Sequence, residues 1–89
     1  MIQSSITISN KLGLHARASA KLTKLAGTFG CDIHLARAGR RVNAKSIMGV
    51  MMLAAGLGAE VEIETHGPDE VQAMAALREL IESKFGEGQ

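Results

Sequence analysis

The chain of 89 residues contains no tryptophan or tyrosine, two phenylalanines, one proline and one cysteine. Two aromatic side chains are too few to form a platform on which nucleic-acid bases stack. Ten lysines and arginines against nine aspartates and glutamates leave a formal charge of +1, so a nucleic-acid-binding surface is not expected. The single cysteine cannot form an internal disulfide, which fits the reducing cytoplasm.

Long apolar runs and targeting signals are also missing. No apolar stretch approaches the roughly 18–20 residues that span a membrane. Residues 1–5 (Met-Ile-Gln-Ser-Ser) contain neither the basic region nor the apolar core of a secretory signal. A chain of this length can bury one hydrophobic core but not two. We therefore expect one cytoplasmic domain over residues 1–89, with no membrane partner.

Hydrophobic periodicity predicts seven elements in the order β-α-β-β-α-β-α. Alternating apolar residues indicate strands, and apolar residues repeated every three or four positions indicate helices. The expected strands are residues 2–9, 32–36, 40–43 and 60–65, and the expected helices are residues 15–26, 46–54 and 69–85. Ser46 and Asp69 are of the residue types that cap helices, and we expect each to cap the helix that follows it.

These elements predict an α+β domain, a two-layer open-faced sandwich in which three helices cover one face of a four-stranded sheet. Periodicity also permits a ferredoxin-like split β-α-β arrangement. On the last strand, Glu60, Glu62 and Glu64 are expected to form a solvated edge, and the tail 87–89 is expected to fray. The buried face of the last helix is expected to contain Val71, Met74, Leu77 or Leu80, Ile81 and Phe85.

Residues 13–19 (Gly-Leu-His-Ala-Arg-Ala-Ser) place a histidine where a turn leads into a helix. His15 should therefore lie at or next to the N-cap, beside backbone N–H groups that have no partner within the helix. The positive end of the helix dipole makes that position favourable for anions. Since Ser, Thr, Asp and Asn are better caps, a histidine there indicates chemistry more than helix stability.

An imidazole at this position could hold a phosphoryl group on a ring nitrogen, because histidine is a workable nucleophile near neutral pH. The backbone N–H of Ala16 would share the charge of the phosphate oxygens, and Arg17 could add a charge-assisted contact. The alternative is a solvent-exposed histidine that starts an ordinary helix.

Two segments resemble one known family. Residues 10–17 (Asn-Lys-Leu-Gly-Leu-His-Ala-Arg) resemble the active-site segment of HPr, the histidine-containing phosphocarrier family of the bacterial phosphoenolpyruvate-dependent phosphotransferase system. Residues 43–51 (Asn-Ala-Lys-Ser-Ile-Met-Gly-Val-Met) resemble the regulatory-serine segment of that family. The two segments are separated as in the family, and the resemblance extends over essentially the whole chain. It implies an antiparallel sheet with the helices on one side.

The resemblance also implies a function. His15 would accept a phosphoryl group on Nδ1 from phosphorylated Enzyme I, which phosphoenolpyruvate charges, and pass it to Enzyme II components such as Enzyme II A. The chain would then be a stoichiometric carrier rather than an enzyme and would need no cofactor. Ser46, otherwise a plain helix cap, would be the target of an HPr kinase/phosphorylase. Many relatives have proline where this chain has Ala18, so its site should be slightly less rigid.

A shallow apolar patch around His15 is expected to bind these partners. Opposite charges steer fast, transient encounters, so a basic rim would imply acidic partner surfaces, and a monomer is expected. The expected patch residues are Leu14, Ala18, Ile47, Met48, Met51 and Leu53, and the expected basic rim is Arg17, Lys21, Lys24 and Lys45.

Other kinds of site have less support. His15, His34 and His66 lack the spacing of metal ligands, so no metal site is expected, and Cys31 is expected to be a buried hydrophobe. Two further functions stay open beside the sugar-branch carrier. One is a carrier of the nitrogen-related phosphotransferase branch, and the other is a non-phosphorylated regulatory adaptor that uses the methionine-bearing patch.

Overall fold

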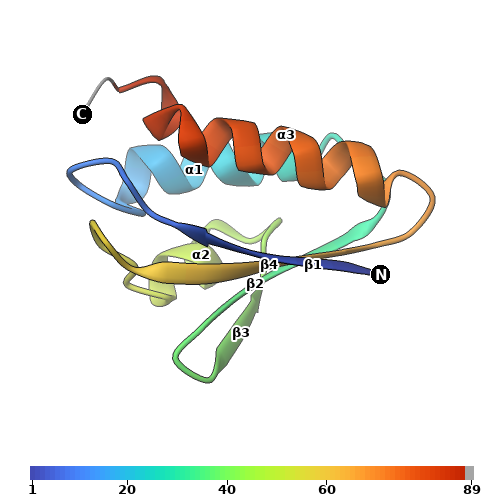
Figure 1. The fold of residues 1–89 in the computed structure, drawn as a ribbon, viewed down its shortest axis with the longest axis horizontal. Helices are drawn as coiled ribbons and strands as arrows, with labels where there is room; N and C mark the ends of the chain where they lie inside the picture. Colours follow the sequence, from blue (N-terminus) through green and yellow to red (C-terminus); the bar gives the residue numbers. More distant parts are fainter. Residues whose placement is uncertain (88–89) are drawn as a thin grey trace.

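A computed structural model describes residues 1–87 of the chain, and it contains the predicted elements in the predicted order (Figure 1). The strands are β1 (Ile2–Thr7), β2 (Asp32–Arg37), β3 (Arg40–Asn43) and β4 (Glu60–His66). The helices are α1 (Ala16–Ala26), α2 (Ile47–Met52) and α3 (Glu70–Glu82), followed by the short 3₁₀ helix η1 (Lys84–Gly86).

The four strands form one antiparallel sheet in the order β1-β4-β2-β3. The registers place Ile6 opposite Val61 and Leu35 opposite Ile63, so apolar side chains of neighbouring strands share the inner face. Strands β1 and β2 run in the same direction with β4 between them. Together with α1 they form a split β-α-β unit, the element shared with the ferredoxin-like alternative.

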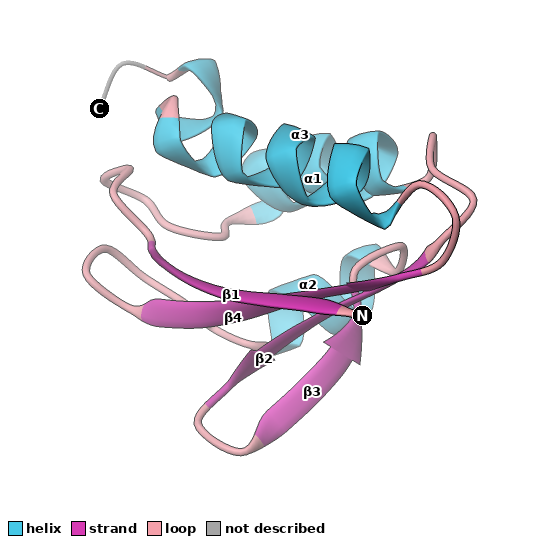
Figure 2. Cartoon of the chain, turned by 45° about the vertical axis from the view of Figure 1, so that its right-hand side comes forward, coloured by secondary structure: helices cyan, strands magenta, loops and turns pink. Residues whose placement is uncertain are grey.

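The helices cover one face of this sheet, which confirms the predicted open-faced sandwich. Figures 1 and 2 show α1 and α3 side by side above the sheet, while α2 lies nearer the level of the strands and packs against α1 and β3. The core between the layers consists of fully buried apolar side chains. The largest are Ile8, Leu22, Ile33, Leu35, Ile63, Leu77, Ile81 and Phe85. Within residues 1–87, no helix has both the length and the apolar character that crossing a bilayer requires.

Two predictions about polarity along the elements were wrong. Val71 is 64% exposed, because α3 turns Ala73, Met74 and Leu77 toward the core and leaves the side of Val71 to solvent. Glu64 is buried, and β4 is an interior strand of the sheet rather than an edge. Both outcomes depend on which neighbour an element packs against, and periodicity does not give that information.

Asp69 also differs from its prediction. It occupies the N-cap position of α3, but its side chain makes no capping hydrogen bond. Its carboxylate instead accepts hydrogen bonds from the backbone N–H groups of Gly30 (2.8 Å) and Cys31 (2.9 Å). The contact with Gly30, the larger cause, holds the pKa of Asp69 below its ordinary value. Burial, followed by the Asp69 carboxylate, raises the pKa of the Cys31 thiol. The carboxylate thus ties the start of α3 to the start of β2.

Candidate functional site

His15 is the N-cap residue of α1, as predicted. Its backbone is extended (φ −73°, ψ 178°), and its carbonyl accepts the first intrahelical hydrogen bond, from Ser19 at 2.8 Å. Its imidazole makes no capping hydrogen bond, so it does not occupy the N–H groups at the start of the helix. Ala16 begins α1, and its N–H is therefore one of the groups without an intrahelical partner.

The turn before His15 is fixed against the loop that follows α2. Gly13 has φ +64°, a conformation that favours glycine, and a Cβ there would overlap the carbonyl oxygen of Ala55. The next residue, Leu14, donates its N–H to that same oxygen at 2.8 Å. The side chain of Ser19 then donates to the carbonyl of Leu14 at 3.0 Å. These contacts fix the backbone at His15 and therefore the point at which its side chain is attached.

Both ring nitrogens of His15 face oxygen acceptors. Nδ1 lies 3.0 Å from the carbonyl oxygen of Gly13, and Nε2 lies 3.1 Å from a carboxylate oxygen of Glu87. The side-chain amide of Asn10, which is fully buried, donates to both of these partners. Its Nδ2 lies 2.8 Å from the Gly13 carbonyl and 3.2 Å from the other carboxylate oxygen of Glu87. These contacts join Gly13, His15, Glu87 and Asn10 in a closed cycle that passes through the imidazole.

Glu87 reaches the histidine because the chain after α3 folds back toward α1. Lys84 (φ 59°) and Phe85 (φ 56°) have left-handed backbones, which cost about 1–2 kcal/mol per residue. Burying the ring of Phe85, worth about 1.5–3 kcal/mol, offsets much of that cost. Lys21 also donates to the carbonyl of Phe85 at 2.7 Å. The prediction of a frayed tail was therefore wrong for Glu87, and its remaining residues, 88–89, lie outside the described residues.

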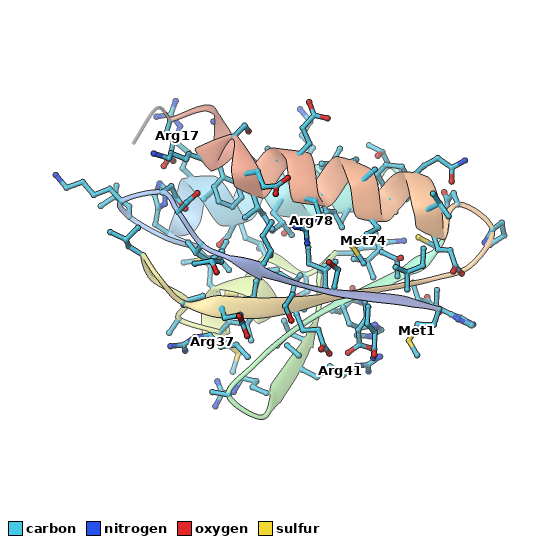
Figure 3. The ribbon with its side chains drawn as sticks, viewed as in Figure 1. Met1, Arg17, Arg37, Arg41, Met74 and Arg78 are labelled. Atoms are coloured by element: carbon cyan, nitrogen blue, oxygen red, sulfur yellow. The ribbon has the colours of Figure 1, made fainter. Side chains whose placement is uncertain are left out.

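A cavity of about 440 Å³ opens beside the imidazole. It brings together three cationic side chains from the turn and from α1 with one carboxylate, that of Glu87, and this excess of positive charge favours an anion such as a phosphoryl group. Figure 3 shows Arg17 at the end of the molecule where the C-terminal segment approaches α1. The lining residues are Lys11, Leu12, His15, Arg17, Lys21, Gly86 and Glu87.

Sequence reasoning missed two parts of this cavity. Lys11 lies within the turn that precedes the histidine, and its closeness to His15 in the sequence could have marked it as a site residue. The position of Glu87 had no local signal, because it depends on how the C-terminal segment packs against α1.

The structure corrects the predicted apolar patch. Leu14, Ala18 and Leu53 belong to the core and are at most 5% exposed, so they offer no contact surface. They are buried because the turn and the loop after α2 pack onto the first turn of α1. The exposed apolar residues of α2 are Ile47, Met48 and Met51, as predicted, and Met52; Leu12 and Leu57 are exposed in the nearby loops. We call these six residues the apolar patch.

Only two of the four residues of the predicted basic rim lie beside His15. Arg17 and Lys21 line the cavity. Lys24 lies in the last turn of α1, about 13.5 Å along the helix axis from His15 at 1.5 Å per residue. Lys45 donates to the carbonyl of Phe29, just beyond that same end of α1, at 2.8 Å. Lys24 and Lys45 therefore flank the far end of α1 and not the histidine.

Ser46 is the N-cap of α2, as predicted. Its Oγ accepts a hydrogen bond from the backbone N–H of Gly49 at 3.2 Å, and the residue is exposed. The hydroxyl therefore has a structural role as a cap and is also reachable from solvent, next to Ile47 and Met48 of the apolar patch.

His34 and His66 lie on the uncovered face of the sheet. They line a second cavity of about 240 Å³, together with Met1, Asp32, Arg41 and Glu64. His34 is half-buried, and His66 is exposed. Among residues 1–87, no group of three or more His, Cys, Asp and Glu side chains is placed to hold a metal ion.

Comparison with known proteins shows which family the chain belongs to. A family model described as "PTS HPr component phosphorylation site" matches residues 2–83. The phosphocarrier protein HPr of Cupriavidus necator is 64% identical over 89 residues and the full length of both chains. A crystal structure of HPr from Thermoanaerobacter tengcongensis superposes with a TM-score of 0.95 at 46% identity, over 98% of each chain. A crystal structure of an HPr dimer from that organism has a TM-score of 0.79 at 46% identity, over 98% of this chain and 100% of that chain.

The open-faced sandwich and the histidine at the start of α1 therefore place the chain in a known family of small domains. The chain belongs to the HPr family of the phosphotransferase system.

Proposed function

We propose that this protein is a phosphocarrier of the sugar phosphotransferase system, and that His15 holds the phosphoryl group. The observation that carries the proposal is the imidazole at the start of α1, beside a cavity with three cationic side chains. It accepts the group from phosphorylated Enzyme I and passes it to Enzyme II components. It is a stoichiometric carrier in the cytoplasm, acts without a cofactor and is not an enzyme.

The chemistry requires a ring nitrogen with a free lone pair. Nδ1 of His15 gives up its contact with the Gly13 carbonyl and attacks phosphorus. The bond between phosphorus and its donor breaks, and the electron pair of that bond stays with the donor. Arg17 and Lys11 then pair with the phosphate oxygens, and the N–H of Ala16 donates to them at the positive end of α1. None of these contacts encloses the group, so it remains accessible to the next acceptor.

The apolar patch is the surface that partners contact. Its exposed side chains lie on α2 and in the loops near the histidine, and the cationic residues of the cavity favour acidic partner surfaces. A carrier must also release its partners quickly, which small interfaces allow. The protein acts as a monomer, although the HPr of Thermoanaerobacter tengcongensis forms a dimer in one crystal structure.

Incubation with Enzyme I and phosphoenolpyruvate tests the proposal. The chain should acquire a phosphate that is labile in acid and stable in base, as expected of phosphohistidine, and His15→Ala should acquire none. Wild-type protein that binds partners without taking up phosphate would instead be the non-phosphorylated adaptor.

The nitrogen-related branch is the second candidate, because its carriers share the histidine segment that this chain resembles. Residues 45–49 (Lys-Ser-Ile-Met-Gly) favour the sugar branch. Transfer from the phosphorylated chain to sugar-type and to nitrogen-type Enzyme II proteins separates the two. A clear preference for the nitrogen type would overturn this assignment.

Ser46 is proposed as a regulatory site. A phosphate at the start of α2 is compatible with the helix, so its effect falls on docking: the added charge repels acidic partners beside Ile47 and Met48. HPr kinase/phosphorylase and ATP should label wild-type protein but not Ser46→Ala, and the labelled protein should receive phosphate from Enzyme I more slowly. Equal labelling of both proteins would show that Ser46 is not the residue that the kinase modifies.

A further inference from the structure

We propose that Glu87 is a positioning residue for His15. Its carboxylate holds the imidazole as the tautomer whose hydrogen is on Nε2, and this leaves the lone pair of Nδ1 to react. The proposal rests on the phosphocarrier function and adds to it the residue that selects the reactive nitrogen.

The two acceptors around the ring cannot both be satisfied by a neutral imidazole. A carbonyl and a carboxylate oxygen accept hydrogen bonds and donate none, whereas a neutral imidazole has a single N–H. The contacts of Nδ1 with Gly13 (3.0 Å) and of Nε2 with Glu87 (3.1 Å) are therefore both made only while both nitrogens carry hydrogen. When the ring loses one proton, one of the two contacts must be given up.

The carboxylate is the stronger of the two acceptors. Hydrogen bonds to an ionised group are roughly twice as strong as those between neutral groups. The Gly13 carbonyl is neutral and already accepts a hydrogen bond from Asn10. Glu87 uses one oxygen for Asn10 and offers the other to His15. The hydrogen therefore stays on Nε2, and Nδ1 is the nitrogen that loses its proton.

Glu87 is held in place independently of the histidine. The buried amide of Asn10 donates to it, and the opposite orientation of that amide would place its oxygen against two acceptors. Phe85 anchors the preceding residues in the core, and Lys21 holds the carbonyl of Phe85. The side chain of Glu87 is 17% exposed, so water screens its contact with the ring only in part.

This arrangement suits the transfer step. When Nδ1 bonds to phosphorus and the donor leaves with its electron pair, the ring gains a positive charge, and its Nε2–H faces the negative charge of Glu87. The two nitrogens lie on different edges of the ring, so Nδ1 can bond to phosphorus while the Nε2–H keeps its contact with the carboxylate. Glu87 thereby stabilises the charged ring, in the way that a buried carboxylate orients a catalytic histidine.

Nitrogen NMR of the unphosphorylated protein, labelled with ¹⁵N in its histidines, tests the proposal. At alkaline pH, where imidazole holds one hydrogen, His15 of the wild type should be the Nε2–H tautomer. Glu87→Ala should give a mixture of tautomers, and Glu87→Gln, whose amide oxygen still accepts a hydrogen bond but carries no charge, should restore the wild-type tautomer only in part. Glu79→Ala, which removes an exposed carboxylate of α3, is the matched control, and His34 and His66 serve as internal references.

Kinetics give a second measurement. Glu87→Ala should lower the kcat of phosphoryl transfer from Enzyme I about fivefold, with the KM for the chain nearly unchanged, and Glu87→Gln should recover part of that loss. An unchanged His15 tautomer in Glu87→Ala would overturn the role of Glu87. Since the tautomer is measured without phosphoryl transfer, a wild-type chain that takes up no phosphate contradicts the proposed function instead.

Discussion

Arg41 on the edge strand β3 reaches across β2 and binds the carboxylate of Glu64 on β4. Its Nη2 lies 3.1 Å and its Nε 3.2 Å from the same carboxylate oxygen. The Glu64 side chain is 10% exposed, and that of Arg41 is 54% exposed. The arginine thus covers a carboxylate that the sheet has largely removed from water, on the face without helices.

Replacing this arginine should therefore destabilise the domain. Arg41→Ala leaves the Glu64 carboxylate without its charged partner, which should lower the free energy of unfolding by about 1–3 kcal/mol. Urea unfolding followed by circular dichroism measures the loss. Arg41→Ala combined with Glu64→Gln should lose less than the sum of the two single changes, and additive losses would contradict the coupling.

Gly13→Ala should be more damaging than Gly58→Ala. Both glycines have positive φ, so each alanine bears the left-handed cost of about 1–2 kcal/mol. The Cβ of an alanine at Gly58 meets open space, whereas at Gly13 it overlaps the Ala55 carbonyl and lies 2.6 Å from Cα of Gly56. Urea unfolding should rank the two variants in this order, and the NMR signals of His15 should shift only in Gly13→Ala. Equal stability of the two variants would show that the turn does not need this close approach.

The carboxylate of Asp69 should make stability depend on pH in acid. Because the folded state lowers its pKa, the unfolded chain takes up this proton first as the pH falls. The contribution of Asp69 is therefore complete above the ordinary aspartate pKa of about 3.9 and disappears as the pH falls through its lower folded value. Asp69→Asn should be less stable than wild type at neutral pH, with a gap that narrows in acid.

Urea midpoints measured from neutral to acid pH test this expectation. Asp32→Asn, which removes an exposed carboxylate one residue beyond Cys31, is the control. A gap between wild type and Asp69→Asn that stays constant with pH would contradict the assignment.

The apolar patch should contribute to docking and not to stability. Met48 is 68% exposed on α2, and Val71 is 64% exposed on the first turn of α3. Met48→Glu should raise the KM for transfer from Enzyme I about tenfold, the effect of losing an interface contact worth about 1.4 kcal/mol. Val71→Glu, an equally exposed position that gains the same charge, should leave the KM unchanged. Equal effects of the two changes would indicate general charge repulsion instead of a docking surface.

Much of the fold could be predicted from the sequence, because its causes are local. The alternation of residues 60–65 and the three- and four-residue spacing after His15 fix the type and order of the elements. The cap positions of His15 and Ser46 followed from the same local pattern. Ile47, Met48 and Met51 were expected in a patch for the partners that the family resemblance implies, and the structure leaves all three exposed on α2.

The rest depends on contacts between segments that are distant in the sequence. Glu64 points away from the helices, as its parity requires, yet Arg41 from another strand covers it. Leu14 precedes the helix in a turn, and it is buried because the loop after α2 packs against that turn. Glu87 reaches His15 only because the backbone at Phe85 turns left-handed. No local periodicity contains these relationships.

The most direct test of phosphoryl transfer through His15 is the mass and the site of phosphorylation after reaction with Enzyme I and phosphoenolpyruvate. Intact-mass measurement should show one added phosphoryl group per chain, and fragmentation under non-acidic conditions should place it on His15. His15→Ala should keep the mass of the unmodified chain. A wild-type chain that gains no phosphoryl group, or a His15→Ala variant that still gains one, would contradict the role of His15 as the carrier residue.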